Sequence, residues 1–74
     1  MRTINIKFHS IGDVKEFSNI INQIEDKATL SDGSYTVNAK SIMGIYSIRL
    51  SAPLELTVEN WKDEYEGMLG KYII

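Results

Sequence analysis

The spacing of apolar residues changes along the chain between two periods, and this change constrains the fold more than any other feature. In residues 3–8 (TINIKF) apolar and polar side chains alternate, which is the period of a strand with one buried face. From Val14 to Ile24 the apolar side chains recur at helical spacing, after a Ser10–Asp13 pair with the spacing of a capping box. The sequence therefore predicts a strand over 3–8 and an amphipathic helix over about 11–25.

The middle of the chain predicts a hairpin and a short helix. Residues 28–38 (ATLSDGSYTVN) read as two short strands joined at Asp32–Gly33, a pair that tolerates the positive φ values of a two-residue type I′ turn. Ser41 then precedes an apolar stretch and can serve as its N-cap. Because Gly44 lies inside this stretch, we expect a helix of only about two turns.

The last third of the chain predicts one more strand and one more helix. Residues 53–59 (PLELTVE) alternate again, and a proline is tolerated at the start of a strand. Asn60 is the expected cap of a final helix with Asp63 and Glu64 in its first turn. The apolar side chains of that helix share one face: Trp61, Tyr65, Met68, Leu69 and Tyr72.

The predicted order is β-α-β-β-α-β-α, and each strand is apolar on one side only. This combination indicates an antiparallel sheet with its helices on one face, an open-faced α+β sandwich. No linker, repeat or low-complexity run divides residues 1–74, so we expect a single domain.

Composition excludes several classes of function. The 74 residues include no cysteine, which excludes disulfides, thiolate metal sites and cysteine catalysis and fits a cytoplasmic protein. With a net charge of −2 and scattered basic residues, nucleic acid is an unfavourable partner. No apolar run approaches the roughly 20 residues of a membrane span. One histidine, acidic residues without EF-hand spacing and dispersed glycines predict neither a metal nor another cofactor.

Residues 31–48 (SDGSYTVNAKSIMGIYSI), taken with the element order, resemble HPr, the small histidine-containing phosphocarrier of the bacterial sugar phosphotransferase system. The resemblance implies a four-stranded sheet in the order 1-4-2-3 with three helices on one side. It also implies protein partners of that system: enzyme I, sugar-specific components, HPr kinase and transcriptional regulators.

The carrier site of that family is not matched in this sequence. In the family, the phosphoryl-carrying histidine precedes the first helix in a Leu-His-Thr-Arg-Pro stretch; here Ser10, Gly12 and Asp13 stand at the His, Arg and Pro positions. His9 is one residue away and is the only candidate catalytic group, but no arginine accompanies it and Asp13 would repel a phosphoryl group. We therefore expect a non-catalytic regulatory or interaction module and no enzyme; the alternative is a divergent phosphocarrier acting through His9.

Ser41 stands where the resemblance implies a regulatory phosphoserine. A phosphate at a helix N-terminus, with Lys40 adjacent, would meet free amides and the positive end of the helix dipole. The alternative is a purely structural domain in which Ser41 only caps its helix. The resemblance further implies that Ile42, Met43 and Tyr46 contact partners, whereas the alternative is that these side chains only fill a thin core.

Overall fold

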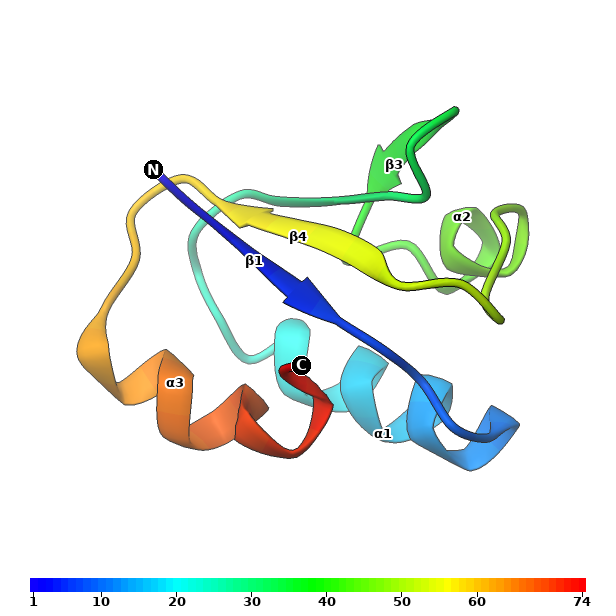
Figure 1. The fold of residues 1–74 in the computed structure, drawn as a ribbon. Coiled ribbons are helices and arrows are strands. Elements are labelled where there is room, and N and C mark those ends of the chain that lie inside the picture. Colours follow the sequence, from blue (N-terminus) through cyan, green and yellow to red (C-terminus); the bar gives the residue numbers. More distant parts are fainter.

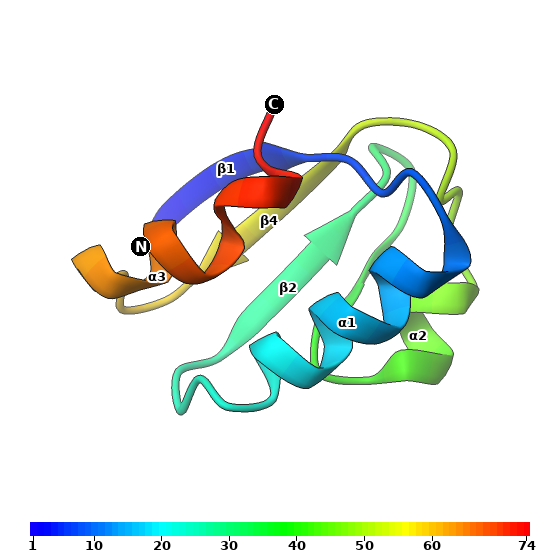
Figure 2. The same ribbon diagram turned by 90° about the horizontal axis from the view of Figure 1, so that it is seen from below.

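A computed structural model describes all 74 residues. The elements follow in the order β1 (Arg2–Ile6), α1 (Ile11–Ile21), β2 (Ala28–Ser31), β3 (Thr36–Asn38), α2 (Ile42–Tyr46), β4 (Leu54–Val58), α3 (Asp63–Leu69) and a 3-10 turn (Gly70–Tyr72). The strands form one antiparallel sheet in the order β1-β4-β2-β3, with the helices on one face (Figure 1 and Figure 2). The predicted fold class, element order and sheet order are confirmed.

The alternation of apolar residues places the core between the sheet and the helices. In β4, Leu54, Leu56 and Val58 point inward and are fully buried, while Glu55 points outward and is exposed. Thr3 of β1 lies beside Thr57 on the open face, and their hydroxyls are 2.8 Å apart. A buried trio packs edge to face beneath the sheet, with ring centroids 5.1 to 5.8 Å apart: Phe8, Phe17 and Tyr72.

Several predicted elements are longer than the observed ones, the first strand and the first helix among them. The first strand ends at Ile6 and the first helix at Ile21, yet Phe8 and Ile24 beyond those ends are still buried. The hydrophobic pattern therefore identified core residues correctly where the backbone had already left regular structure.

The predicted two-residue turn at Asp32–Gly33 is wrong. The strands stop at Ser31 and Thr36, so four residues form the loop, and Gly33, with φ 96°, is its only residue of positive φ. A type I′ turn needs positive φ at both central positions. Here the Asp32 Oδ1 atom instead accepts hydrogen bonds from the Ser34 and Tyr35 amides at 2.8 Å each, which holds Asp32 itself in an ordinary conformation.

The predicted cap of the last helix is also wrong. Helix α3 begins at Asp63, and Lys62 occupies the N-cap position without a side-chain hydrogen bond. The Asn60 side chain donates instead to Asp26 Oδ1 at 3.2 Å, a partner 34 residues away. Carboxylates in the first turn, including Asp63 and Glu64, favour the positive helix end without a cap.

The final residues return to the edge of the sheet. After the 3-10 turn, Ile73 forms an isolated antiparallel bridge with Ile6 of β1. The Lys7 amide donates to the Tyr72 carbonyl at 2.8 Å, and the Ile74 amide donates to the Asn5 carbonyl at 3.0 Å. None of the helices has the length and apolar character that a bilayer crossing requires.

Candidate functional site

Ser41 is the N-cap of helix α2, as predicted. The Ser41 backbone is extended and its Oγ accepts a hydrogen bond from the Gly44 amide at 3.2 Å. At the other end, the Ser47 hydroxyl donates to the Gly44 carbonyl at 2.6 Å. Two serines therefore bracket a helix of five residues, and the Ser41 side chain is exposed beside it.

Most of the apolar side chains of α2 meet solvent. Ile45 is fully buried in the core, whereas Ile42, Met43 and Tyr46 are 38%, 78% and 41% exposed. The helix lies close to β3 because residue 44 is a glycine: a Cβ there would be 3.3 Å from the Val37 Cβ. Thus α2 anchors through one face and presents three large apolar side chains on the other.

Lys40 does not point freely toward Ser41. Its ammonium donates to the Ile24 carbonyl, just beyond the end of α1, and its amide donates to Asn38 Oδ1 at 2.9 Å. A cation near the carbonyl end of a helix is favourable. The role expected for Lys40 beside a phosphate stays a prediction, because its ammonium donates to the Ile24 carbonyl and would have to bind the phosphate as well.

The start of α1 contains a variant of the predicted capping box. The Asp13 amide donates to Ser10 Oγ at 3.2 Å, and Asp13 Oδ2 accepts from the His9 amide at 2.9 Å. In the usual box the acidic side chain returns to the N-cap amide, which would be that of Ser10. The carboxylate of Asp13 therefore occupies the positive end of this helix.

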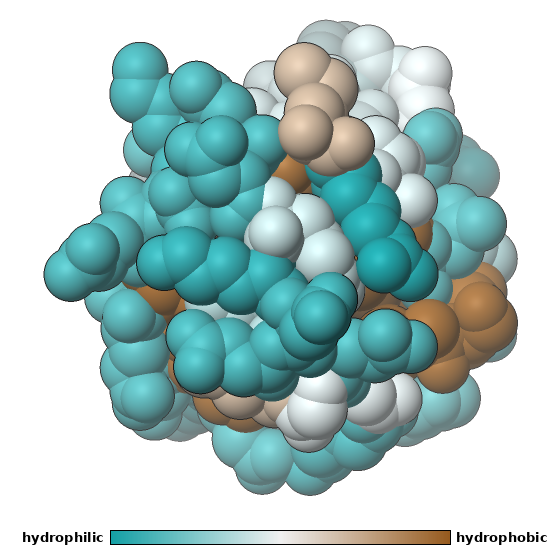
Figure 3. All heavy atoms as spheres, turned by 90° about the vertical axis from the view of Figure 1, so that its left-hand side faces the viewer, coloured by the Kyte–Doolittle hydropathy of each residue, from teal (hydrophilic) through white to brown (hydrophobic).

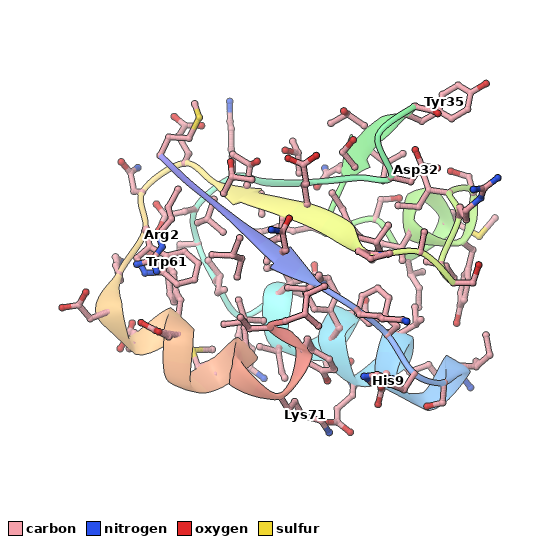
Figure 4. All side chains as sticks on the ribbon, viewed as in Figure 1. Arg2, His9, Asp32, Tyr35, Trp61 and Lys71 are labelled. Atoms are coloured by element: carbon pink, nitrogen blue, oxygen red, sulfur yellow. The ribbon has the colours of Figure 1, made fainter.

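The imidazole of His9 is exposed and makes no hydrogen bond or ion pair (Figure 4). It borders an open depression of about 400 Å³ where the start of α1 meets the connection that follows α2. The depression is lined by Lys7, Phe8, His9, Ser10, Ile11, Val14, Leu50 and Ser51. The fold thus brings one lysine and no arginine to the imidazole.

Sequence reasoning missed Leu50 and Ser51 as neighbours of His9. The two residues lie about 40 positions further along the chain, in a connection without regular structure. No local spacing signals that contact. Lys7 carried a weak signal, because its parity in the first strand already placed it on the polar side with His9.

Asp32 joins the β2–β3 loop to the connection after α2. Besides the two amides of its own loop, its Oδ2 atom accepts from the Arg49 amide at 3.1 Å. Backbone donation, first from Tyr35 and then from Arg49, holds the pKa of Asp32 below its ordinary value. The sequence predicted only a turn residue at this position.

No protein-family model matches the sequence, and no curated protein matches it. Among solved structures, HPr-C-His from Thermoanaerobacter tengcongensis superposes with a TM-score of 0.79 at 23% identity, covering 96% of this chain and 89% of that one. The chain has the HPr fold. A phosphocarrier protein HPr from Bacillus anthracis superposes with a TM-score of 0.72 at 23% identity, covering 96% of this chain and 93% of that one. The resemblance to HPr expected from residues 31–48 is thus confirmed at the level of the fold.

Proposed function

We propose that this chain is a cytoplasmic regulatory protein of the phosphotransferase-system type, which binds protein partners through α2 and is phosphorylated on Ser41. The observation that carries the proposal is the position of Ser41: its exposed hydroxyl stands at the edge of three exposed apolar side chains, Ile42, Met43 and Tyr46. An apolar surface of this kind favours docking of a protein. A charged group added at its edge would change which partners fit.

Phosphorylation of Ser41 would act through local electrostatics. A phosphoserine carries a charge of about −1.5 to −2 at neutral pH. Its oxygens would take over the Gly44 amide that the hydroxyl now accepts from. The same charge would have to be desolvated by any partner that covers Ile42 and Met43, so modification selects between partners as well as adjusting affinity.

The geometry at α1 supports a regulatory role over a carrier role. A transferable phosphoryl group on His9 would need hydrogen-bond donors or cations to stabilise it. The carboxylate of Asp13 instead accepts a hydrogen bond from the His9 amide, which engages that donor and places a negative charge close by. The Arg49 amide is held by Asp32, and Arg49 does not line the depression at His9. The carrier arrangement therefore lacks an arginine beside the imidazole, and a carboxylate lies at the start of the helix instead.

The proposal is tested with a bacterial HPr kinase and ATP, read by intact mass. We expect a gain of one phosphate that is lost in Ser41→Ala. Ser47→Ala is the matched control, because Ser47 is an exposed serine at the other end of the same helix. Absence of modification in the wild type, or its persistence in Ser41→Ala, would contradict the proposal.

One observation favours the alternative, a divergent phosphocarrier: Lys7 and His9 line the same depression at the start of α1. Incubation with enzyme I and phosphoenolpyruvate distinguishes the two functions. A carrier gains one acid-labile phosphate that His9→Ala abolishes. We expect no such gain in the wild type.

A further inference from the structure

Several basic side chains of this protein are engaged within the fold. The end at which α3 begins is covered for the most part by hydrophilic side chains (Figure 3), and there Lys62 lies 5.9 Å from the centre of the Tyr65 ring. The opposite end carries α2 and the β2–β3 loop (Figure 1). Directly before α2, Lys40 is half-buried, and it is the one basic residue whose side chain donates to a main-chain carbonyl, that of Ile24.

The bond from Lys40 to Ile24 joins two separate parts of the chain. Ile24 is 2% exposed and lies in the connection between α1 and β2. A buried main-chain carbonyl needs a hydrogen-bond partner, and an ammonium is a strong one. The pKa of Asp26, in the same connection, is lowered mainly by the Tyr65 hydroxyl and to a smaller extent by the charge of Lys40. The Lys40 side chain is thus directed to the α1–β2 connection.

The turn that leads into Ser41 is held at each of its residues. Ala39 is fully buried, and its amide donates to the Ala28 carbonyl at 3.0 Å. The amides of Lys40 and Ser41 donate to the side-chain and main-chain oxygens of Asn38 at 2.9 and 3.0 Å. The Lys40 side chain adds a bond that fastens this turn to the α1–β2 connection. The position of the Ser41 hydroxyl therefore depends on a distant part of the chain as well as on the local turn.

We propose that Lys40 is a positioning residue for Ser41: its bond to the Ile24 carbonyl fixes the turn that presents the hydroxyl, and the ammonium keeps this partner when Ser41 carries a phosphate. The inference rests on the proposed function and deepens it, because it assigns a residue to the presentation of that hydroxyl. As a phosphate ligand, the ammonium would have to leave a buried carbonyl without a partner. Such an unpaired group is costly, so the exchange is unfavourable.

The test measures kcat and KM of Ser41 phosphorylation by a bacterial HPr kinase. Lys40→Met removes the ammonium and should lower kcat about tenfold with KM unchanged, because a displaced hydroxyl reacts less often while contacts with the kinase stay. Lys40→Arg keeps a donor for the carbonyl and should restore most of kcat. Lys27→Met is the matched control: Lys27 is an exposed lysine near Ile24 whose ammonium forms no hydrogen bond or ion pair, so both constants should stay the same.

Phosphorus NMR of the phosphorylated protein distinguishes positioning from binding of the phosphate. If Lys40 stays on the Ile24 carbonyl, the phosphoserine should titrate at the same pH in Lys40→Met as in Lys27→Met. If the ammonium pairs with the phosphate, its removal raises the pKa of the phosphoserine, because an opposite charge favours the ionised form. A higher pKa in Lys40→Met alone would therefore overturn the inference.

Hydrogen exchange tests the bond without the kinase. Lys40→Met should exchange the Ser41 and Gly44 amides about tenfold faster than the wild type, whereas Lys27→Met should not. If the kinase does not modify wild-type Ser41, the proposed function fails, and hydrogen exchange alone decides whether Lys40 holds the turn. If Ser41 is modified but Lys40→Met changes KM in place of kcat, or leaves both unchanged, only this inference is overturned. Circular dichroism verifies that each variant folds, and Lys40→Gln replaces Lys40→Met if that variant does not.

Discussion

The two ends of this molecule use the same residue types in opposite ways. At the hydrophilic end, the Trp61 ring meets Tyr65 edge to face at 5.8 Å and carries the Arg2 guanidinium 4.9 Å from its centroid (Figure 4). The Tyr65 hydroxyl donates to Asp26 at 2.8 Å. At the α2 end, Tyr35 and Tyr46 remain exposed.

The comparison teaches that aromatic content alone does not identify a binding surface. The last helix offers more aromatic surface in the sequence than α2 does, but cations, carboxylates and the core cover it. Edge-to-face aromatic pairs and cation–π contacts stabilise a fold by about 0.5–1.5 kcal/mol each. Tyr35 and Tyr46 near α2 make no such contacts, so their rings add little to the stability of the fold.

The largest expected effect comes from truncating a tyrosine at each end. Tyr65 is 3% exposed and Tyr35 is 69% exposed, so the two form a matched pair. Tyr65→Ala should lower the free energy of unfolding by about 3 kcal/mol through lost packing and a cavity. Tyr35→Ala should change it by no more than about 0.5 kcal/mol. Urea unfolding measures both, and equal losses would break the distinction between the two ends.

Replacing one glycine at each end by alanine should have the next largest effect on stability, with opposite signs at the two ends. Gly33 has φ 96°, where an alanine is strained, so Gly33→Ala should destabilise by about 1–2 kcal/mol. Gly67 lies inside α3 with nothing within 4 Å of an added Cβ. Gly67→Ala should therefore stabilise by about 1 kcal/mol, the difference in helix propensity. Thermal unfolding measures both changes in stability, and changes of the same sign would contradict this account.

The smallest effect is a change in acid sensitivity. The Tyr65 hydroxyl, helped by Asn60, holds the pKa of Asp26 below its ordinary value of 3.8. The stability contributed by this ionised carboxylate is present above 3.8 and is lost as the pH falls through the lower folded-state pKa. Asp26→Asn, which cannot take up that proton, should show a shallower loss of stability in acid. Urea unfolding between about pH 5 and pH 2 measures the slope, and identical slopes would show that Asp26 does not contribute.

Local patterns in the sequence predicted most of the fold and part of the candidate site. The alternation in residues 54–58 and the Ser41 cap depend on neighbouring residues, so they could be predicted from spacing alone. Local spacing did not decide how many apolar side chains of α2 meet solvent. The observed helix has five residues, of which Ile45 is buried, so Ile42, Met43 and Tyr46 remain exposed.

By itself, then, the sequence determined the strands, the helices and the inward face of each, because hydrophobic period and capping act over a few residues. Only the tertiary structure decided that Asp32 reaches the Arg49 amide, that Asn60 turns to Asp26, and that Leu50 and Ser51 lie beside His9. Each of these contacts joins residues at least 17 positions apart. Such partners have no signature in local spacing, because packing of the whole chain brings them together.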